Sequence, residues 1–287
     1  DHRDLHSFPT RRSSDLDRNS EITGAISYRS IPDNLVEIAV QFEGESDAVL
    51  DNDDLLIFYG RGASGVDHNG LDISHHQNLY FTENTYWLLI PDDNTLQGKR
   101  VASIEPVTST GVTMDYGISP FYVESDLINP FAGGLAWAGA AIMNGSSHTA
   151  VTTMDSPNPL VDVHVTIGFL GNSSSIDAQA NPAHLLKIYH DSRDALQTTN
   201  SWTGLTKSEV TFSFSGNRLN NGINIFIIDN ESTNSYSQPH FDYLTGNYGR
   251  NLDDQGLPYE FFAPIHSNAT TFRITAEIGR ASCRERV

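Results

Sequence analysis

The segment Leu160–Leu170, with the sequence LVDVHVTIGFL, decides the fold class. Positions 161, 163, 165 and 167 are apolar, whereas positions 162, 164 and 166 are polar. Alternation with a period of two residues is typical of a β-strand that covers a core with one face. We therefore expect a strand here, with its valines directed inward.

Similar segments recur along the chain. Val36–Phe42 and Val210–Phe214 alternate in the same way, and Leu55–Tyr59 and Tyr86–Ile90 are short and aromatic. Ile223–Ile228 is apolar except for Asn224, the pattern of a buried strand. Turn signals such as Asn-Gly pairs separate these segments, and helical periodicity is scarce. The sequence predicts an all-β fold, a β-sandwich or jelly roll with little helix.

The domain organisation is less sharply marked than the fold class. The best helical candidate, residues 181–189, also fits a strand. Between residues 105 and 120, proline and a run of Ser, Thr and Gly interrupt the strand pattern, which indicates a boundary. We expect two β-domains, a smaller one over residues 17–117 and a larger β-sandwich over residues 118–276.

The two ends of the chain match a translated sequencing adapter. Residues 1–16 read DHRDLHSFPTRRSSDL, and residues 277–287 read EIGRASCRERV, the same adapter from the opposite strand. We expect neither segment to be native and exclude both from reasoning about the fold. Cys283, the chain's one cysteine, lies in the second segment. A signal peptide or a further domain of the parent protein would lie outside this sequence.

The chain is strongly acidic, with 36 Asp and Glu against 17 Lys and Arg and a net charge of −19. Removing the adapter-like ends takes six basic and five acidic residues and leaves −20. This charge repels phosphate backbones, so no nucleic acid is expected as a partner. The longest apolar run, Leu135–Met143, is too short to span a membrane. We expect an extracytoplasmic protein, secreted or at the cell surface.

No catalytic set is expected within the chain. A thiolate nucleophile needs a cysteine, and the sole cysteine is adapter-like. Ser64 lies in a Gly-rich turn without the strand-to-helix context of a nucleophilic serine. Two Glu-Ser-Asp tripeptides, at 45–47 and 124–126, would place both carboxylates about 6.5–7 Å apart on one strand face. That spacing suits an inverting glycosidase, but so short a pattern does not establish one.

Candidate metal ligands precede a predicted strand. Asp51, Asp53 and Asp54 form a possible Ca²⁺ loop, although an apolar residue takes a ligand position of the EF-hand pattern; a solvated turn is the alternative. A second Asp pair stands at 253–254. The stretch 67–76 is rich in His and Asp, but its two adjacent histidines point to opposite sides of an extended chain, so zinc is not expected. No other cofactor is expected.

Two tryptophans are the candidate ligand-binding residues. Trp137 and Trp202 stand close to Gly139 and Gly204, and sugar-binding β-sandwiches stack ligands on exposed indoles. The alternative is that both side chains anchor the core of the sandwich.

A series of short motifs in a fixed order gives the sequence a resemblance to a known family. In order, it comprises Asp54–Gly60 (DLLIFYG), Asn78–Tyr80, Asn84–Leu88, Gly98–Arg100, Glu124–Asp126, Trp137–Gly139, Gly168–Gly171, Ser201–Gly204, Phe241–Leu244 and Tyr248–Leu252. The series resembles the N-terminal, non-catalytic region of gingipain-type cysteine peptidases. It is most similar to the branch that includes the signal-peptidase, sortase-like component of the type nine secretion system.

The resemblance implies a β-rich region that precedes a caspase-like α/β domain, whose catalytic His and Cys would lie downstream of Ile274. This chain would then scaffold or cover the peptidase domain, or present substrate to it. Its partners would be that domain and components of the secretion system or cell surface. Two alternatives stay open. One is a carbohydrate-binding or adhesin-type sandwich, and the other is a latency-conferring prodomain in which Arg61 enters the peptidase cleft.

Overall fold

The computed structural model describes residues 6–9, 36–44, 52, 54–69, 72–76, 78, 81–89, 98–102, 111–132, 136–173, 183–253, 261–264 and 270–275. The chain forms two compact units. The first contains residues 1–65 and 76–108, and the second contains residues 66–75 and 109–287. The predicted boundary after residue 117 falls inside a strand of the second unit, and the chain changes unit between Thr108 and Ser109.

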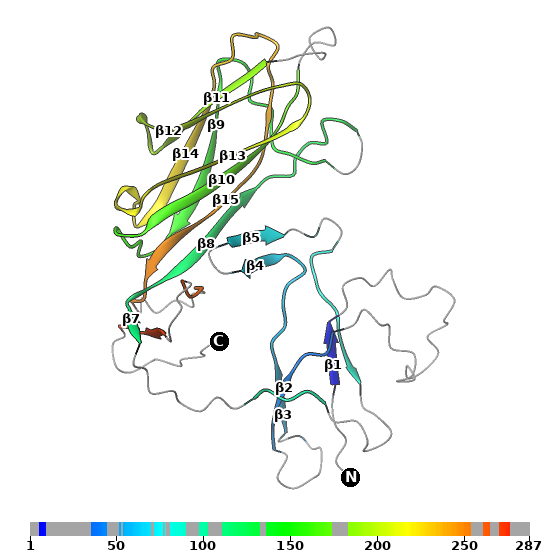
Figure 1. The fold of residues 1–287 in the computed structure, drawn as a ribbon. Helices are drawn as coiled ribbons and strands as arrows, with labels where there is room; N and C mark the ends of the chain where they lie inside the picture. Colours follow the sequence, from blue (N-terminus) through cyan, green and yellow to red (C-terminus); the bar gives the residue numbers. More distant parts are fainter. Residues whose placement is uncertain are drawn as a thin grey trace, which may run out of the picture. The chain divides into compact units, whose positions relative to one another are not determined.

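Short antiparallel strand pairs make up the described strands of the first unit (Figure 1). Strand β2 (Val40–Glu43) pairs with β3 (Leu55–Phe58), and β1 (His6–Pro9) pairs with β6 (Tyr86–Leu89). β1 lies within residues 1–16, which we expect not to be native. The paired strands β4 (Gly65–Asn69) and β5 (Asp72–His76) are placed almost entirely in the second unit.

The second unit is a β-sandwich of two four-stranded sheets (Figure 1). The first sheet has the order β13-β10-β15-β8, and the second has the order β12-β11-β14-β9. Apart from the β11–β12 hairpin, successive strands from β8 to β15 alternate between the sheets, as in jelly rolls. The strands are β8 (Tyr116–Glu124), β9 (Ser147–Met154), β10 (Asp162–Leu170), β11 (Ala183–His190), β12 (Ser192–Thr203), β13 (Lys207–Ser215), β14 (Gly222–Asn230) and β15 (His240–Asn251).

Two smaller features accompany the sandwich. Strand β7 (Val112–Met114) pairs in parallel with β16 (Thr270–Phe272). Across the described residues the only helical segment is a 3₁₀ turn, Gly216–Arg218, and none of their helices is long and apolar enough to cross a membrane. The expected all-β sandwich with little helix is therefore confirmed.

The core forms where the inward faces of the two sheets meet. Val163, Val165 and Ile167 of β10 are fully buried, as their alternation predicted, and they belong to one cluster with Phe226 of β14 and Leu244 of β15. Burial of each such side chain contributes about 1.5–3 kcal/mol relative to its exposed state. The period-two pattern on both sheets thus produces a single apolar layer between them.

Strand β14 differs from its prediction in one respect. The run from Ile223 to Ile228 was expected to be buried throughout, yet only Asn224, Phe226 and Ile228 are buried in it. Ile223, Ile225 and Ile227 alternate with them and lie on the outer face of the sheet. An apolar run marks a strand but does not show whether anything covers its second face.

Candidate functional site

A row of polar side chains crosses the outer face of the first sheet. In the antiparallel register, Glu124 of β8 pairs with Tyr243 of β15, which pairs with Gly168 of β10, which pairs with Glu209 of β13. Tyr122 stands two residues before Glu124 and therefore on the same face of β8. Cross-strand neighbours at these positions are close enough for their side chains to interact.

Two tyrosine–carboxylate hydrogen bonds organise this row. The Tyr122 hydroxyl donates to Oε2 of Glu124, and the Tyr243 hydroxyl donates to Oε1 of Glu209 at 2.5 Å. The two phenol rings lie with centroids 6.3 Å apart and planes inclined by 20°. The rings are therefore neighbours in nearly parallel planes, each held by a carboxylate.

Gly168 makes room for the second ring. A Cβ atom added at Gly168 would lie 2.8 Å from Cδ1 of Tyr243, so this ring rests directly on the β10 backbone. The first ring is stacked against His75 of β5, with centroids 3.6 Å apart and planes inclined by 7°. The β4–β5 pair thus contacts the first sheet at Tyr122. Tyr243 lies farther from β5 than Tyr122 does.

Negative charge exceeds positive charge around the two rings. Oδ2 of Asp242 lies 3.5 Å from Nζ of Lys207, and Asp126 acts electrostatically on both Glu124 and Asp242. Burial raises the pKa of the Glu124 carboxyl, although the bond from Tyr122 opposes this. Burial likewise raises the pKa of Asp242, and Lys207 partly offsets it.

The tyrosines themselves are poor acids in this setting. Burial and the adjacent carboxylates raise the pKa of Tyr122 and of Tyr243 well above the ordinary value of 10. Both phenols therefore stay protonated at neutral pH and act as donors, while the carboxylates act as acceptors. We call Tyr122, Glu124, Glu209, Asp242 and Tyr243 the tyrosine face. Its chemistry suits binding of hydroxyl-rich or cationic groups.

The Glu-Ser-Asp pair does not keep the geometry expected from an extended strand. β8 ends at Glu124, so the strand alternation does not continue to Asp126. The side chain of Asp126 nevertheless hydrogen-bonds that of Glu124 and raises its pKa, while Glu124 also accepts the hydrogen bond from Tyr122. The other tripeptide, at 45–47, lies outside the described residues.

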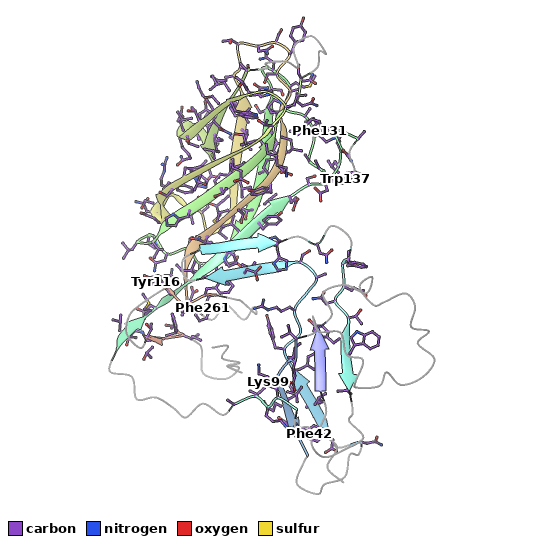
Figure 2. The ribbon with its side chains drawn as sticks, turned by 45° about the vertical axis from the view of Figure 1, so that its right-hand side comes forward. Phe42, Lys99, Tyr116, Phe131, Trp137 and Phe261 are labelled. Carbon is purple, nitrogen blue, oxygen red and sulfur yellow. The ribbon has the colours of Figure 1, made fainter. Side chains whose placement is uncertain are left out.

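The two candidate tryptophans occupy different environments. Trp202 packs against the core and stacks on Phe169 with a centroid distance of 6.0 Å, and His184 lies at 4.6 Å. Its buried Nε1 has no hydrogen-bond partner among the residues that the structure describes. Trp137 is 42% exposed, and Figure 2 shows it with Phe131 on the segment between β8 and β9.

The proposed calcium loop is only partly described. Asp51 and Asp53 lie outside the described residues, and Asp54 packs against Gly44, whose φ of +108° suits glycine. In the second Asp pair, Oδ2 of Asp253 accepts a hydrogen bond from Ser156. The described part of the chain contains no group of three or more His, Cys, Asp or Glu placed to hold a metal ion.

The remaining candidates have structural contacts. Oγ of Ser64 accepts a hydrogen bond from the Asn78 backbone, which fits a turn. The carbonyl of Arg61 accepts hydrogen bonds from Asn84 and from the Tyr86 hydroxyl, while its side chain is exposed. Cys283 lies outside the described residues.

Reasoning from sequence missed the tyrosine face as a unit. Its members come from three strands, β8, β13 and β15, that are separated by long stretches of chain. Only the sheet register brings them together, and the local patterns at residues 122–124 and 241–243 carry no sign of that pairing. The Glu124–Asp126 tripeptide and the Phe241–Leu244 motif each touched it, without linking its strands.

Comparisons with known proteins add a likeness of fold. No family model matches the chain, and no curated protein matches it. The crystal structure of dimeric latent PorU from Porphyromonas gingivalis is similar, with a TM-score of 0.59 and 13% identity. The match covers 90% of this chain and 23% of that chain, so this chain spans about a quarter of that protein.

Two structures from carbohydrate-active proteins match less well. The CBM36-1 domain of a multidomain xylanase from the hindgut metagenome of Trinervitermes trinervoides has a TM-score of 0.31 and 13% identity, covering 45% of this chain and 96% of that domain. An arabinoxylan arabinofuranohydrolase of glycoside hydrolase family 43 from Bacillus subtilis has a TM-score of 0.28 and 11% identity, covering 59% of this chain and 34% of that one. The likeness to PorU shows a shared fold.

Proposed function

We propose that this chain is a non-catalytic β-sandwich region of a gingipain-type cysteine peptidase, which precedes the catalytic domain and scaffolds it, covers it or presents substrate to it. The observation that carries the proposal is the likeness of fold to latent PorU over 90% of the chain. The ordered motifs of the sequence are an independent support.

The positions of those motifs favour a structural role. Phe169 and Phe241 are buried in the core, and Trp202 packs against it. Gly168 admits the ring of Tyr243. Residues that fill a core or permit close packing maintain a fold rather than carry out chemistry. Several motif positions of the second unit thus shape the sandwich.

The same proposal includes location and partners. The acidic chain, with a net charge of −19, fits an extracytoplasmic protein that is secreted or held at the cell surface. Its partners would be the downstream peptidase domain and components of the secretion system or cell surface, without nucleic acid. It would need no cofactor for this role, and a structural Ca²⁺ at Asp51, Asp53 and Asp54 is a separate proposal.

The parent gene tests the proposal directly. DNA sequence extended past residue 276 should encode a caspase-like domain with catalytic His and Cys, and its absence would contradict the proposal. The parent protein lacking residues 111–275 should fail to accumulate in folded form. A catalytic Cys→Ala variant of the parent should accumulate normally but lose peptide cleavage, which separates scaffolding from catalysis.

The chain by itself should not hydrolyse peptides. Purified chain carrying Cys283→Ser should show no cleavage of a fluorogenic peptide panel above buffer. Hydrolysis that survives this replacement would show a thiol-independent active site and overturn the non-catalytic assignment.

Carbohydrate binding is the second candidate, favoured by the two neighbouring tyrosine rings and the exposed Trp137. Exposed aromatic rings provide a stacking surface for sugar rings. Affinity electrophoresis in neutral soluble polysaccharides should show retardation that is lost in Trp137→Ala or Tyr243→Ala and kept in Phe81→Ala. Unretarded migration of the unmodified chain in every polysaccharide would exclude this candidate.

A further inference from the structure

Tyr122 and Tyr243 form a pair of neighbouring phenol rings on the outer face of the first sheet. Their strands, β8 and β15, are paired, and Tyr243 lies opposite Glu124, two residues along β8 from Tyr122 (Figure 1). Aromatic side chains at such diagonal positions are within reach of each other. The ring centroids lie 6.3 Å apart, and the ring planes are inclined by only 20°. Two oxidisable side chains therefore lie side by side on adjacent strands.

Neighbouring groups hold both rings in place. His75 of β5 stacks on Tyr122 with ring centroids 3.6 Å apart. The Tyr243 ring lies over Gly168, which has no side chain to displace it. Each phenol hydroxyl is also fixed by a hydrogen bond to a carboxylate. Rings held at this separation need only side-chain rotation, without movement of the strands, to bring the carbon atoms next to their phenol oxygens into contact.

The same hydrogen bonds provide a path for the phenol protons. Tyr122 donates to Oε2 of Glu124, and Tyr243 donates to Oε1 of Glu209 at 2.5 Å. Short O–H···O bonds to a carboxylate are charge-assisted and strong. Loss of one electron turns a phenol into a strong acid, so its proton passes to the bonded carboxylate as the electron leaves. Burial and the nearby carboxylates raise the pKa of both phenols, so neither loses its proton before it is oxidised.

Both rings are also accessible from solution. Tyr122 and Tyr243 are each partly exposed, so a small oxidant can reach them. A thiol would repair a phenoxyl radical by giving it a hydrogen atom, but the chain's one cysteine, Cys283, lies in the adapter-like end. Two radicals held side by side in one molecule combine more readily than radicals on separate molecules.

We propose that Tyr122 and Tyr243 are an oxidative cross-linking site, at which a one-electron oxidant, such as a peroxidase intermediate, joins the two rings as dityrosine. Each phenol gives one electron to the oxidant and one proton to its carboxylate, which leaves a neutral phenoxyl radical. The two radicals form a carbon–carbon bond between ring positions next to the phenol oxygens. The hydrogen on each bonded carbon then moves to the adjacent oxygen and restores the phenol.

The overall reaction is balanced by the oxidant. Two equivalents of the one-electron oxidant are reduced, the two carboxylic acids return their protons to water, and the protein loses two hydrogen atoms. The product would join β8 to β15, strands that are distant in sequence. A cross-link over so long a stretch restricts the unfolded chain and so stabilises the fold. The inference does not depend on the proposed relation to peptidases.

Photo-oxidation with a ruthenium tris-bipyridyl complex and persulfate tests the proposal. The monomer carrying Cys283→Ser should acquire the blue fluorescence of dityrosine. Proteolytic digestion and tandem mass spectrometry should identify a linked peptide pair that contains residues 122 and 243 and is two hydrogen atoms lighter than its parts. The same chain unfolded in urea should not favour this pair. Absence of the link, or a yield in the folded monomer no higher than in urea, would overturn the proposal.

Substitutions test the site and the proton path. Tyr243→Phe should abolish the link, whereas Tyr236→Phe, at a 49% exposed position, should leave its yield unchanged. Glu209→Gln should slow cross-linking several-fold, because an amide still accepts the hydrogen bond but does not take up the proton. Glu231→Gln, a matched change beside the second sheet, should have no effect. Circular dichroism verifies folding, and Tyr122→Phe replaces Tyr243→Phe if that variant is unfolded. Equal rates in the two glutamine variants would overturn the proton path.

Discussion

Gly168 gives the sharpest test of the tyrosine face. Replacing a strand glycine with alanine ordinarily stabilises a protein by about 0.4–1 kcal/mol, because the unfolded chain loses freedom. Here the new Cβ would lie 2.8 Å from Cδ1 and 2.9 Å from Cζ of Tyr243, well inside the carbon–carbon contact distance of about 3.5–4.0 Å. The ring must move, and moving it breaks its hydroxyl's hydrogen bond to Glu209.

The expected size follows from these two effects. Hydrogen bonds to charged groups contribute about 1.5–3 kcal/mol, and less at an exposed pair such as this one. With displacement of the ring included, Gly168→Ala should lower the free energy of unfolding by about 1–2 kcal/mol. In a Tyr243→Ala background, which removes the obstacle, the same change should be neutral or slightly stabilising.

Urea unfolding of the four proteins in this double-mutant cycle measures the coupling between the two positions. We expect a coupling energy of about 2 kcal/mol. If Gly168→Ala destabilises both backgrounds equally, the ring does not rest on the β10 backbone and the described geometry of the face is wrong.

Three further predictions concern the sandwich. Phe226→Ala should cost about 3–5 kcal/mol in urea unfolding because it opens a cavity in the core, whereas Ile223→Ala on the outer face should cost about 1 kcal/mol or less. Burial lowers the pKa of His184 and His190, so below the ordinary pKa of 6.5 the unfolded chain binds more protons than the folded chain. The free energy of unfolding should therefore decrease as the pH decreases, by about 1.4 kcal/mol per pH unit for each histidine. A melting series from about pH 7 to 5 should show a shallower slope in His190→Gln, and an unchanged slope would contradict the assignment. Asp191 has a φ of +58° and accepts two hydrogen bonds. In equilibrium unfolding, Asp191→Ala should lower the free energy of unfolding by about 2 kcal/mol, and Asp191→Gly by less, because glycine adopts a positive φ without strain. Equal losses would exclude backbone strain at this position.

The strands were predictable because alternation is a local property. Val163, Val165 and Ile167 stand at alternate positions, and the structure buries all three in β10. The stretch 181–189, which fitted a helix or a strand, became β11 because its inward residues, Leu186 and Ile188, complete the core. Packing across the sandwich, which no local window contains, decided between the two readings.

The candidate site was less predictable because it depends on register. Nothing near Glu124 in sequence indicates that Tyr243 lies opposite it, more than a hundred residues later. The tryptophans show a related difficulty, since both stand close to a glycine, yet Trp202 packs against the core and Trp137 is exposed. Residue type and local spacing do not distinguish these environments, because burial is set by segments distant in the chain.

The path of the chain between the two units has a practical consequence. Residues 66–75 belong to the second unit but are encoded between two stretches of the first. Cleavage after residue 108 would therefore leave β4 and β5 on the amino-terminal fragment, although His75 of β5 stacks on Tyr122 of the second unit. A fragment that starts at residue 109 would lack the ring that stacks on Tyr122, so a fragment meant to contain the whole second unit has to include residues 66–75.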